Sequence, residues 1–141
     1  MFASEVGTGK ISSMERKITP LRVLVVDDET LIRWSLSETL TDRGCLVSEA
    51  GDARGARNAI RDASLAFDVA VLDLRLPDSE DLSLLQSVRL SAPDTQIILM
   101  TAFGTPDIMR RALELGAYRV VNKPFELHEL ADLIEEAGAC R

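Results

Sequence analysis

Acidic, hydroxyl and basic side chains stand at the carboxyl ends of four apolar segments of this chain. In chain order they are Asp27 and Asp28, then Asp73, then Thr101, then Lys123. In a parallel sheet the carboxyl ends of the strands lie at one edge, so we expect these groups to converge. Three carboxylates beside a hydroxyl and an ammonium group could hold a divalent metal ion and accept a phosphoryl group.

The chemistry of this set follows from its charges. Neighbouring carboxylates raise one another's pKa values, so the cluster destabilises the fold unless a cation joins it. Mg²⁺ suits one or two carboxylates completed by phosphate oxygens and water. Asp73 could then attack phosphorus and form an aspartyl-phosphate, with Lys123 and Thr101 stabilising the new charge. Taken singly, each residue is better explained as a helix cap, turn former or surface group, so the hypothesis rests on their common position.

Strand and helix patterns alternate from residue 21 onward. The expected strands cover residues 22–26, 46–49, 69–73, 96–101 and 118–121. The first, third and fourth are nearly continuous apolar runs, which are typical of strands buried on both faces of a parallel sheet. Five strand–helix units with right-handed crossovers predict an α/β fold, a doubly wound five-stranded parallel sheet with helices on both faces.

The helix ends are marked by capping residues and glycines. Gly44 is expected to stop the first helix, and Asp52 is expected to cap the second. Thr105 followed by Pro106 predicts the start of the fourth helix, which Gly116 ends. These signals place the helices between the expected strands.

Size and composition narrow the classes of protein. The chain has 141 residues, which suits one domain with a sizeable core. Its formal net charge is −7, so it lacks the basic surface of a nucleic-acid binder. Its only histidine, His128, and its two cysteines, Cys45 and Cys140, have no metal-ligand spacing, which argues against a zinc site. Residues 1–20 lack a signal-peptide core and no apolar run could span a membrane, so we expect a cytoplasmic protein.

Four segments, taken in order, resemble the receiver domain of bacterial two-component response regulators. They lie at residues 25–29, 72–77, 100–102 and 122–125. The resemblance implies a flavodoxin-like fold with strand order 2-1-3-4-5 and a receiver domain at residues 21–138. Residues 1–20 are polar and without periodicity, and we expect them to be a flexible leader. Residues 139–141 would be a C-terminal tail or the start of a linker.

The resemblance implies a role for each residue of the expected site. Asp73 would be the phosphoacceptor, and its donor would be a sensor histidine kinase or a phosphotransfer protein. Thr101 and Lys123 would contact the phosphoryl oxygens. The cofactor would be Mg²⁺, for which Mn²⁺ could substitute. Its ligands would be Asp27 through water, Asp28, Asp73 and the backbone carbonyl of Arg75.

Val120 departs from the family pattern, because the family has an aromatic switch residue at this position. Tyr118 lies two residues earlier, on the same face of an alternating strand but about 6.6 Å along it, so we do not expect it to replace that aromatic. Val120 is too small and too stiff to make the aromatic's movement. The switch would then rest on Thr101 and the loop at residues 102–105, where Gly104 supplies backbone freedom.

Two further backbone features follow from the resemblance. The Lys123–Pro124 peptide bond would be cis, although base rates alone favour trans. Asp81 stands where the family has glycine. Aspartate tolerates a left-handed backbone better than most residues, so we expect the loop to keep its course.

The expected output surface is the face formed by the helix after Pro106, the strand at 118–121 and the last helix. Phosphorylation would shift this face, which could also form a homodimer. Residues 32–36 and 101–105 further resemble the nitrogen-regulatory branch, which controls ATP-dependent enhancer-binding transcription activators. The output would then be transcription, while this chain itself would bind neither nucleic acid nor membrane.

The main hypothesis is a phosphorylated signalling switch rather than a turnover enzyme. One alternative is a Mg²⁺-dependent phosphatase of the haloacid-dehalogenase type with an aspartate nucleophile. Such enzymes usually place Asp-x-Asp on the first strand and carry a substrate cap, and Asp27-Asp28 lacks that spacing. The other is a pseudo-receiver that binds partners without phosphorylation, against which the intact set of reactive residues argues.

Overall fold

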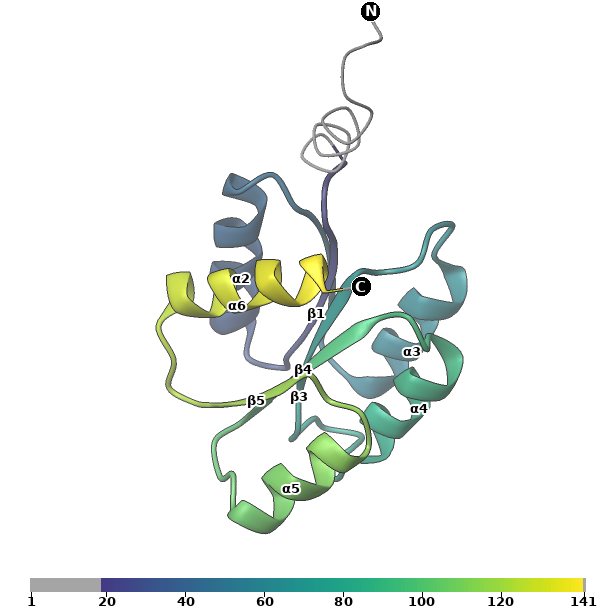
Figure 1. Ribbon diagram of the computed structural model, residues 1–141, viewed down its shortest axis with the longest axis vertical. Coiled ribbons are helices and arrows are strands. Elements are labelled where there is room, and N and C mark those ends of the chain that lie inside the picture. Colours follow the sequence, from purple (N-terminus) through teal and green to yellow (C-terminus); the bar gives the residue numbers. More distant parts are fainter. Residues whose placement is uncertain (1–18, 141) are drawn as a thin grey trace, which may run out of the picture.

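The computed structural model describes residues 19–140. Five strands and five helices alternate along this part of the chain (Figure 1): β1 (Arg22–Val26), α2 (Thr30–Asp42), β2 (Leu46–Ala50), α3 (Ala53–Asp62), β3 (Val69–Asp73), α4 (Ser83–Ser91), β4 (Gln96–Thr101), α5 (Pro106–Glu114), β5 (Arg119–Asn122) and α6 (Leu127–Ala139). The leader expected at residues 1–20 lies outside the described residues, apart from its last two, and so does residue 141 of the expected tail.

The strands form one parallel sheet in the order β2-β1-β3-β4-β5, which confirms the predicted fold class and strand order. All five residues of the central strand, β3, are buried, as its continuous apolar sequence indicates. The register pairs Asp73 with Met100 and Thr101 with Asn122. The carboxyl ends of β3, β4 and β5 therefore lie side by side.

Two helical layers cover the sheet. α2 and α6 lie on one face, and α3, α4 and α5 lie on the other (Figure 1). Alternate residues of each central strand face the two layers. Val25 and Val71 pack with α2 and α6, whereas Leu24 and Leu72 pack with the opposite layer. Because these strands are anchored from both faces, their carboxyl ends are held at defined positions.

The helix ends follow the predicted signals. Asp52 and Thr105 each accept a hydrogen bond from a backbone N–H in the first turn of α3 and α5, at 2.7 and 3.2 Å. Gly44 and Gly116, with φ angles of 90° and 104°, adopt the left-handed backbone just after α2 and α5. No helix within residues 19–140 is long and apolar enough to cross a membrane.

β5 begins one residue later than predicted, because the strand expected at 118–121 runs from Arg119 to Asn122. Tyr118 lies before the strand and packs with α2 and α6, whereas Val120 packs with the opposite layer. The prediction that both side chains share a face is therefore wrong, since strand alternation starts only after Tyr118. The second strand also extends one residue beyond its predicted end, to Ala50.

Candidate functional site

Asp73 ends the central strand at the carboxyl edge of the sheet, and only 6% of the residue is exposed. One carboxylate oxygen, Oδ2, lies 3.1 Å from Lys123 Nζ. The other, Oδ1, accepts a hydrogen bond from Arg75 N at 3.2 Å. The strand therefore presents a nearly buried carboxylate that has one cationic partner.

Asp27 follows β1 and is fully buried. Its backbone N–H donates to Ala50 O at 3.1 Å, and its Oδ1 accepts a hydrogen bond from Glu29 N at 2.8 Å. Its Oδ2 lies 2.9 Å from Lys123 Nζ but makes no hydrogen bond of good geometry. A buried carboxylate oxygen with so few partners is costly, and it remains available to a cation.

Lys123 is the ammonium group of the site and joins three carboxylates. Its Nζ lies 2.9, 3.0 and 3.1 Å from oxygens of Asp27, Glu29 and Asp73, and 11% of its side chain is exposed. Burial disfavours the charged form, but the Asp27 and Glu29 carboxylates outweigh that effect and raise the pKa of Lys123. The peptide bond between Lys123 and Pro124 is cis. One ammonium group thus faces more negative charge than it can neutralise.

The surplus of negative charge acts on Asp73. Burial, and after it the Asp27 carboxylate, raise the pKa of Asp73 to about 6, although Lys123 opposes the shift. The folded protein therefore disfavours the ionised form of its most central carboxylate. A cation bound beside Asp73 would remove that penalty and leave the carboxylate free to act as a nucleophile.

The acidic cluster fits a hard divalent cation such as Mg²⁺. Carboxylate oxygens of Asp27, Glu29 and Asp73 lie within 4.8 Å of one another, and oxygen atoms are the ligands that Mg²⁺ prefers. Asp28, which the sequence analysis names as a direct ligand, is exposed and lies outside this cluster. Glu29, which has no predicted role, belongs to the cluster. The run of three acidic residues at 27–29 was the available signal.

Thr101 ends β4 next to this cluster and is buried. Its Oγ1 accepts a hydrogen bond from Phe103 N at 3.1 Å, and its carbonyl accepts one from Lys123 N at 2.8 Å. The following loop passes so near Asn122 that a Cβ atom at Gly104 would lie 2.7 Å from Asn122 Oδ1. The φ of Gly104 is not positive, so any side chain placed there would meet Asn122 rather than backbone strain, and the Asn122 side chain would have to move.

The loop after Asp73 contacts three other parts of the molecule: the loop that carries Phe103, the start of α3 and the start of α4. The Arg75 guanidinium lies 4.8 Å from the centre of the Phe103 ring. Asp78 accepts hydrogen bonds from two N–H groups at the start of α3, at 2.8 and 3.0 Å, and these bonds lower its pKa. Asp81 accepts one from the first turn of α4 at 2.9 Å. Within residues 19–140 only glycines have a positive φ, so the left-handed backbone considered for Asp81 does not occur.

Arg33, on α2, contacts the backbone of the acidic segment at residues 27–29. Its guanidinium donates to Asp27 O at 2.6 Å and to Glu49 Oε1 at 3.0 Å. The sequence around Arg33 does not indicate these contacts, since they depend on how α2 packs against β2. The arginine holds the backbone that carries the buried Asp27 carboxylate.

Comparison with known proteins identifies relatives. The family described as the response regulator receiver domain matches residues 23–135. The DNA-binding transcriptional regulator NtrC of Proteus hauseri is 36% identical over 115 residues, which are 82% of this chain and 24% of the relative. The response regulator protein PilR of Pseudomonas aeruginosa is 34% identical over 116 residues, 82% of this chain and 26% of the relative. The chain thus spans about a quarter of the length of these relatives.

Solved structures share the fold. The CheY-like response regulator receiver domain protein of Methanospirillum hungatei gives a TM-score of 0.81 at 28% identity, over 86% of this chain and 95% of that chain. The solution structure of the beryllofluoride-activated NtrC4 receiver domain dimer gives 0.77 at 34% identity, over 84% and 96%. Both likenesses include nearly the whole of the compared domains.

Proposed function

The chain belongs to the response regulator receiver domain family, and from that membership we propose that Asp73 is its phosphoacceptor. The observation that carries the proposal is the 3.1 Å contact between the buried Asp73 carboxylate and Lys123 Nζ. Burial at the end of β3 fixes the position of the Asp73 carboxylate. Lys123 places its own ammonium group beside the position that the transferred phosphoryl group would take. Fixed position and charge are most of what phosphoryl transfer needs.

The phosphoryl donor would be a phosphohistidine on a sensor histidine kinase or a phosphotransfer protein. An oxygen of Asp73 attacks phosphorus, the bond between phosphorus and the histidine nitrogen breaks, and that nitrogen keeps the electron pair. The product is an acyl phosphate on Asp73. The chain then acts as the acceptor of a signal and not as a turnover enzyme.

The cofactor in this proposal is Mg²⁺, with Mn²⁺ as a substitute. Asp27, Glu29 and Asp73 are proposed to hold it, because their oxygens already lie within 4.8 Å of one another. Family membership adds Asp28 and the carbonyl of Arg75 to the proposed ligands. When bound, the cation neutralises the carboxylates and the phosphoryl oxygens.

Lys123 and Thr101 are proposed to stabilise the phosphorylated state. Lys123 would exchange its ion pair with Glu29 for one with the phosphoryl oxygens, since Glu29 is the exposed member of the cluster. Thr101 would turn its hydroxyl from Phe103 N toward the same oxygens. Loss of that bond would free the loop at residues 102–105, which leads directly into α5.

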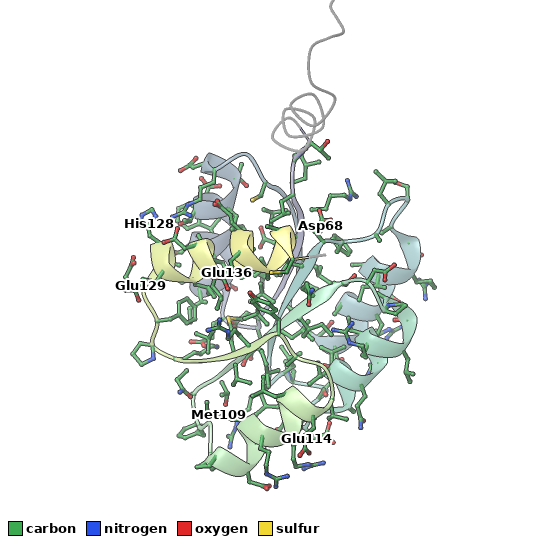
Figure 2. All side chains as sticks on the ribbon, viewed as in Figure 1. Asp68, Met109, Glu114, His128, Glu129 and Glu136 are labelled. Atoms are coloured by element: carbon green, nitrogen blue, oxygen red, sulfur yellow. The ribbon has the colours of Figure 1, made fainter. Side chains whose placement is uncertain are left out.

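The proposed output surface is the face formed by α5, β5 and α6. Figure 2 shows α5, marked by Met109 and Glu114, and α6, marked by Glu129 and Glu136, on either side of this strand. The NtrC4 relative is a receiver domain dimer when activated by beryllofluoride, which supports a homodimer of this chain. The NtrC relative is a DNA-binding transcriptional regulator, which supports control of transcription by a longer protein.

Acetyl phosphate with Mg²⁺ tests the proposed function by intact mass. Wild type should gain one phosphoryl group, and Asp73→Asn should gain none. Asp28→Asn and Glu29→Gln, compared side by side, show which of the two carboxylates supports metal-dependent labelling. Undiminished labelling of Asp73→Asn would contradict the assignment. Turnover of added phosphomonoesters would indicate the phosphatase, and a folded wild type without any adduct would indicate the pseudo-receiver.

A further inference from the structure

We propose that Arg75 and Phe103 form a latch between the phosphoacceptor loop and the loop that leads into α5, and that a phosphoryl group on Asp73 opens it. The inference rests on the proposed function, because its trigger is the phosphoryl group. It assigns Phe103 as a positioning residue, which acts on the loop at 102–105, and Arg75 as the side chain that exchanges the Phe103 ring for the phosphoryl oxygens.

The latch closes a chain of contacts across the site. Arg75 N donates to Asp73 Oδ1 at 3.2 Å, and the Arg75 guanidinium lies 4.8 Å from the centre of the Phe103 ring. Phe103 N in turn donates to Thr101 Oγ1 at 3.1 Å. The two ends of this chain are the carboxylate and the hydroxyl that the phosphoryl group would contact. Both anchors of Phe103 are therefore within reach of one chemical event.

Arg75 is poised to change partner. Within residues 19–140, no carboxylate lies within ion-pair distance of its guanidinium. Its aromatic partner is itself 66% exposed. An exposed cation–π contact of this kind shifts an equilibrium by only about two- to fivefold. The latch is thus strong enough to bias the loop and weak enough to be displaced.

A phosphoryl group on Asp73 supplies the stronger competitor. It carries about 1.5 to 2 negative charges and three acceptor oxygens, and guanidinium groups bind such oxygens through paired, charge-assisted hydrogen bonds. Arg75, two residues away, would leave the ring for the phosphoryl oxygens. Thr101 Oγ1 would leave Phe103 N for the same oxygens. Phe103 then loses both contacts, and the loop before α5 is released.

The latch would supply an aromatic side chain that responds to phosphorylation, which Val120 does not offer. Val120 packs into the layer of α3, α4 and α5 and offers no aromatic ring to swing. Phe103 places a ring in the loop between β4 and α5, where its backbone N–H donates to Thr101 Oγ1. The alternative is that the Arg75–Phe103 contact is surface packing that does not respond to Asp73.

Two substitutions of Phe103 separate these readings. Phe103→Leu keeps apolar bulk but removes the ring, and Phe103→Tyr keeps the ring. Both act at an exposed side chain, so the fold is expected to survive. The probe is beryllium fluoride with Mg²⁺ as the phosphoryl mimic. The readouts are the Arg75 side-chain proton resonances, which a ring above the guanidinium shifts upfield, and amide hydrogen exchange at residues 102–105.

Without the mimic, the upfield shift of Arg75 should be present in wild type and Phe103→Tyr and lost in Phe103→Leu. Exchange at residues 102–105 should be about two- to fivefold faster in Phe103→Leu than in wild type. With the mimic, the wild-type shift should disappear. Identical Arg75 resonances in wild type and Phe103→Leu would overturn the latch.

The mimic separates a failed latch from a failed function. If beryllium fluoride perturbs the Asp73 resonances but the wild-type Arg75 shift persists, the coupling is overturned while the phosphoacceptor assignment stands. If the Asp73 resonances do not respond to the mimic, and acetyl phosphate also adds no mass, the proposed function is overturned and the trigger of the latch with it.

Discussion

The interior of the sheet and its carboxyl edge are both buried, yet they act on stability in opposite directions. Residues 69–72 of β3 are fully buried apolar side chains, and burying one large apolar side chain stabilises a fold by roughly 1.5–3 kcal/mol. The next residue, Asp73, is buried almost as deeply, but burial and Asp27 raise its pKa and oppose its charge. One step along the strand reverses the sign of the contribution.

This difference shows how the fold accommodates its site. The central strands are anchored by helices on both faces, so their ends stay in place even though the carboxylates at those ends repel one another. The unfavourable cluster is confined to one edge, where the proposed function places a cation and a phosphoryl group. The apolar interior stabilises the fold, and the carboxylate cluster at the edge opposes it.

The interior is expected to show the largest effect. Leu72→Ala removes a fully buried side chain and should lower the free energy of unfolding by about 2–5 kcal/mol. Leu90→Ala, at a residue that is 84% exposed, is the control and should change it by less than about 0.5 kcal/mol. Urea unfolding without Mg²⁺ measures both. If Leu72→Ala lowered the free energy of unfolding by less than about 1 kcal/mol, the interior would not be the main source of stability that this comparison requires.

Asp73→Asn should have the opposite sign. The pKa of Asp73 is about 6 in the folded protein against 3.8 as the ordinary value. Its contribution to stability is therefore fully present below about pH 4 and is lost as the pH rises through about 6. Asp73→Asn avoids that loss and should raise the free energy of unfolding by about 1–3 kcal/mol at pH 7.5 without Mg²⁺.

The control for this prediction is the pH dependence itself together with a neighbouring carboxylate. The gain from Asp73→Asn should vanish near pH 3.5, where wild type is also protonated. Asp28→Asn, at an exposed residue outside the cluster, should give no comparable gain. Equal gains from both substitutions at pH 7.5 would mean that general charge repulsion, and not the buried edge, sets the penalty.

Mg²⁺ should reduce the same penalty by binding the folded state. At a free concentration ten times its dissociation constant, a single bound ion stabilises the fold by about 1.4 kcal/mol. Thermal unfolding with and without the ion measures this effect, which should be smaller in Asp73→Asn than in wild type. If the wild-type unfolding temperature does not change in millimolar-range Mg²⁺, the proposed metal binding is contradicted.

Glu29→Gln should show the smallest effect. The Glu29 side chain is 58% exposed and pairs with Lys123 at 3.0 Å, and exposed ion pairs contribute little because water screens them. The substitution should change the free energy of unfolding by less than about 0.5 kcal/mol. A loss above about 1 kcal/mol in urea unfolding would place Glu29 with the buried members of the cluster.

The interior of this fold was predictable from sequence because its signals are local. Continuous apolar runs indicated β1, β3 and β4. Asp52, Thr105 and Gly116 marked helix ends through contacts made within a few residues. The strand order entered through the family resemblance, and the pairing of the strands confirms it.

The details of the edge were less predictable because they depend on packing between elements. Which carboxylate of residues 27–29 turns inward is decided by the backbone that Arg33 and Ala50 hold, and Glu29, not Asp28, joins the cluster. Tyr118 was predicted to share a face with Val120. Because β5 begins only at Arg119, Tyr118 lies outside the alternation of the strand and packs into the opposite layer. The Arg75–Phe103 contact joins two loops and leaves no pattern in either.

The central proposal is that Asp73, the nearly buried carboxylate at the end of the central strand, is the phosphoacceptor. Borohydride reduces an acyl phosphate and leaves homoserine in place of the aspartate that carried it, and peptide mass spectrometry then identifies the position. After reaction with acetyl phosphate and Mg²⁺, homoserine should be found at residue 73 alone. Reduction products at residues 27–29, or a phosphorylated chain without any product at residue 73, would contradict the claim.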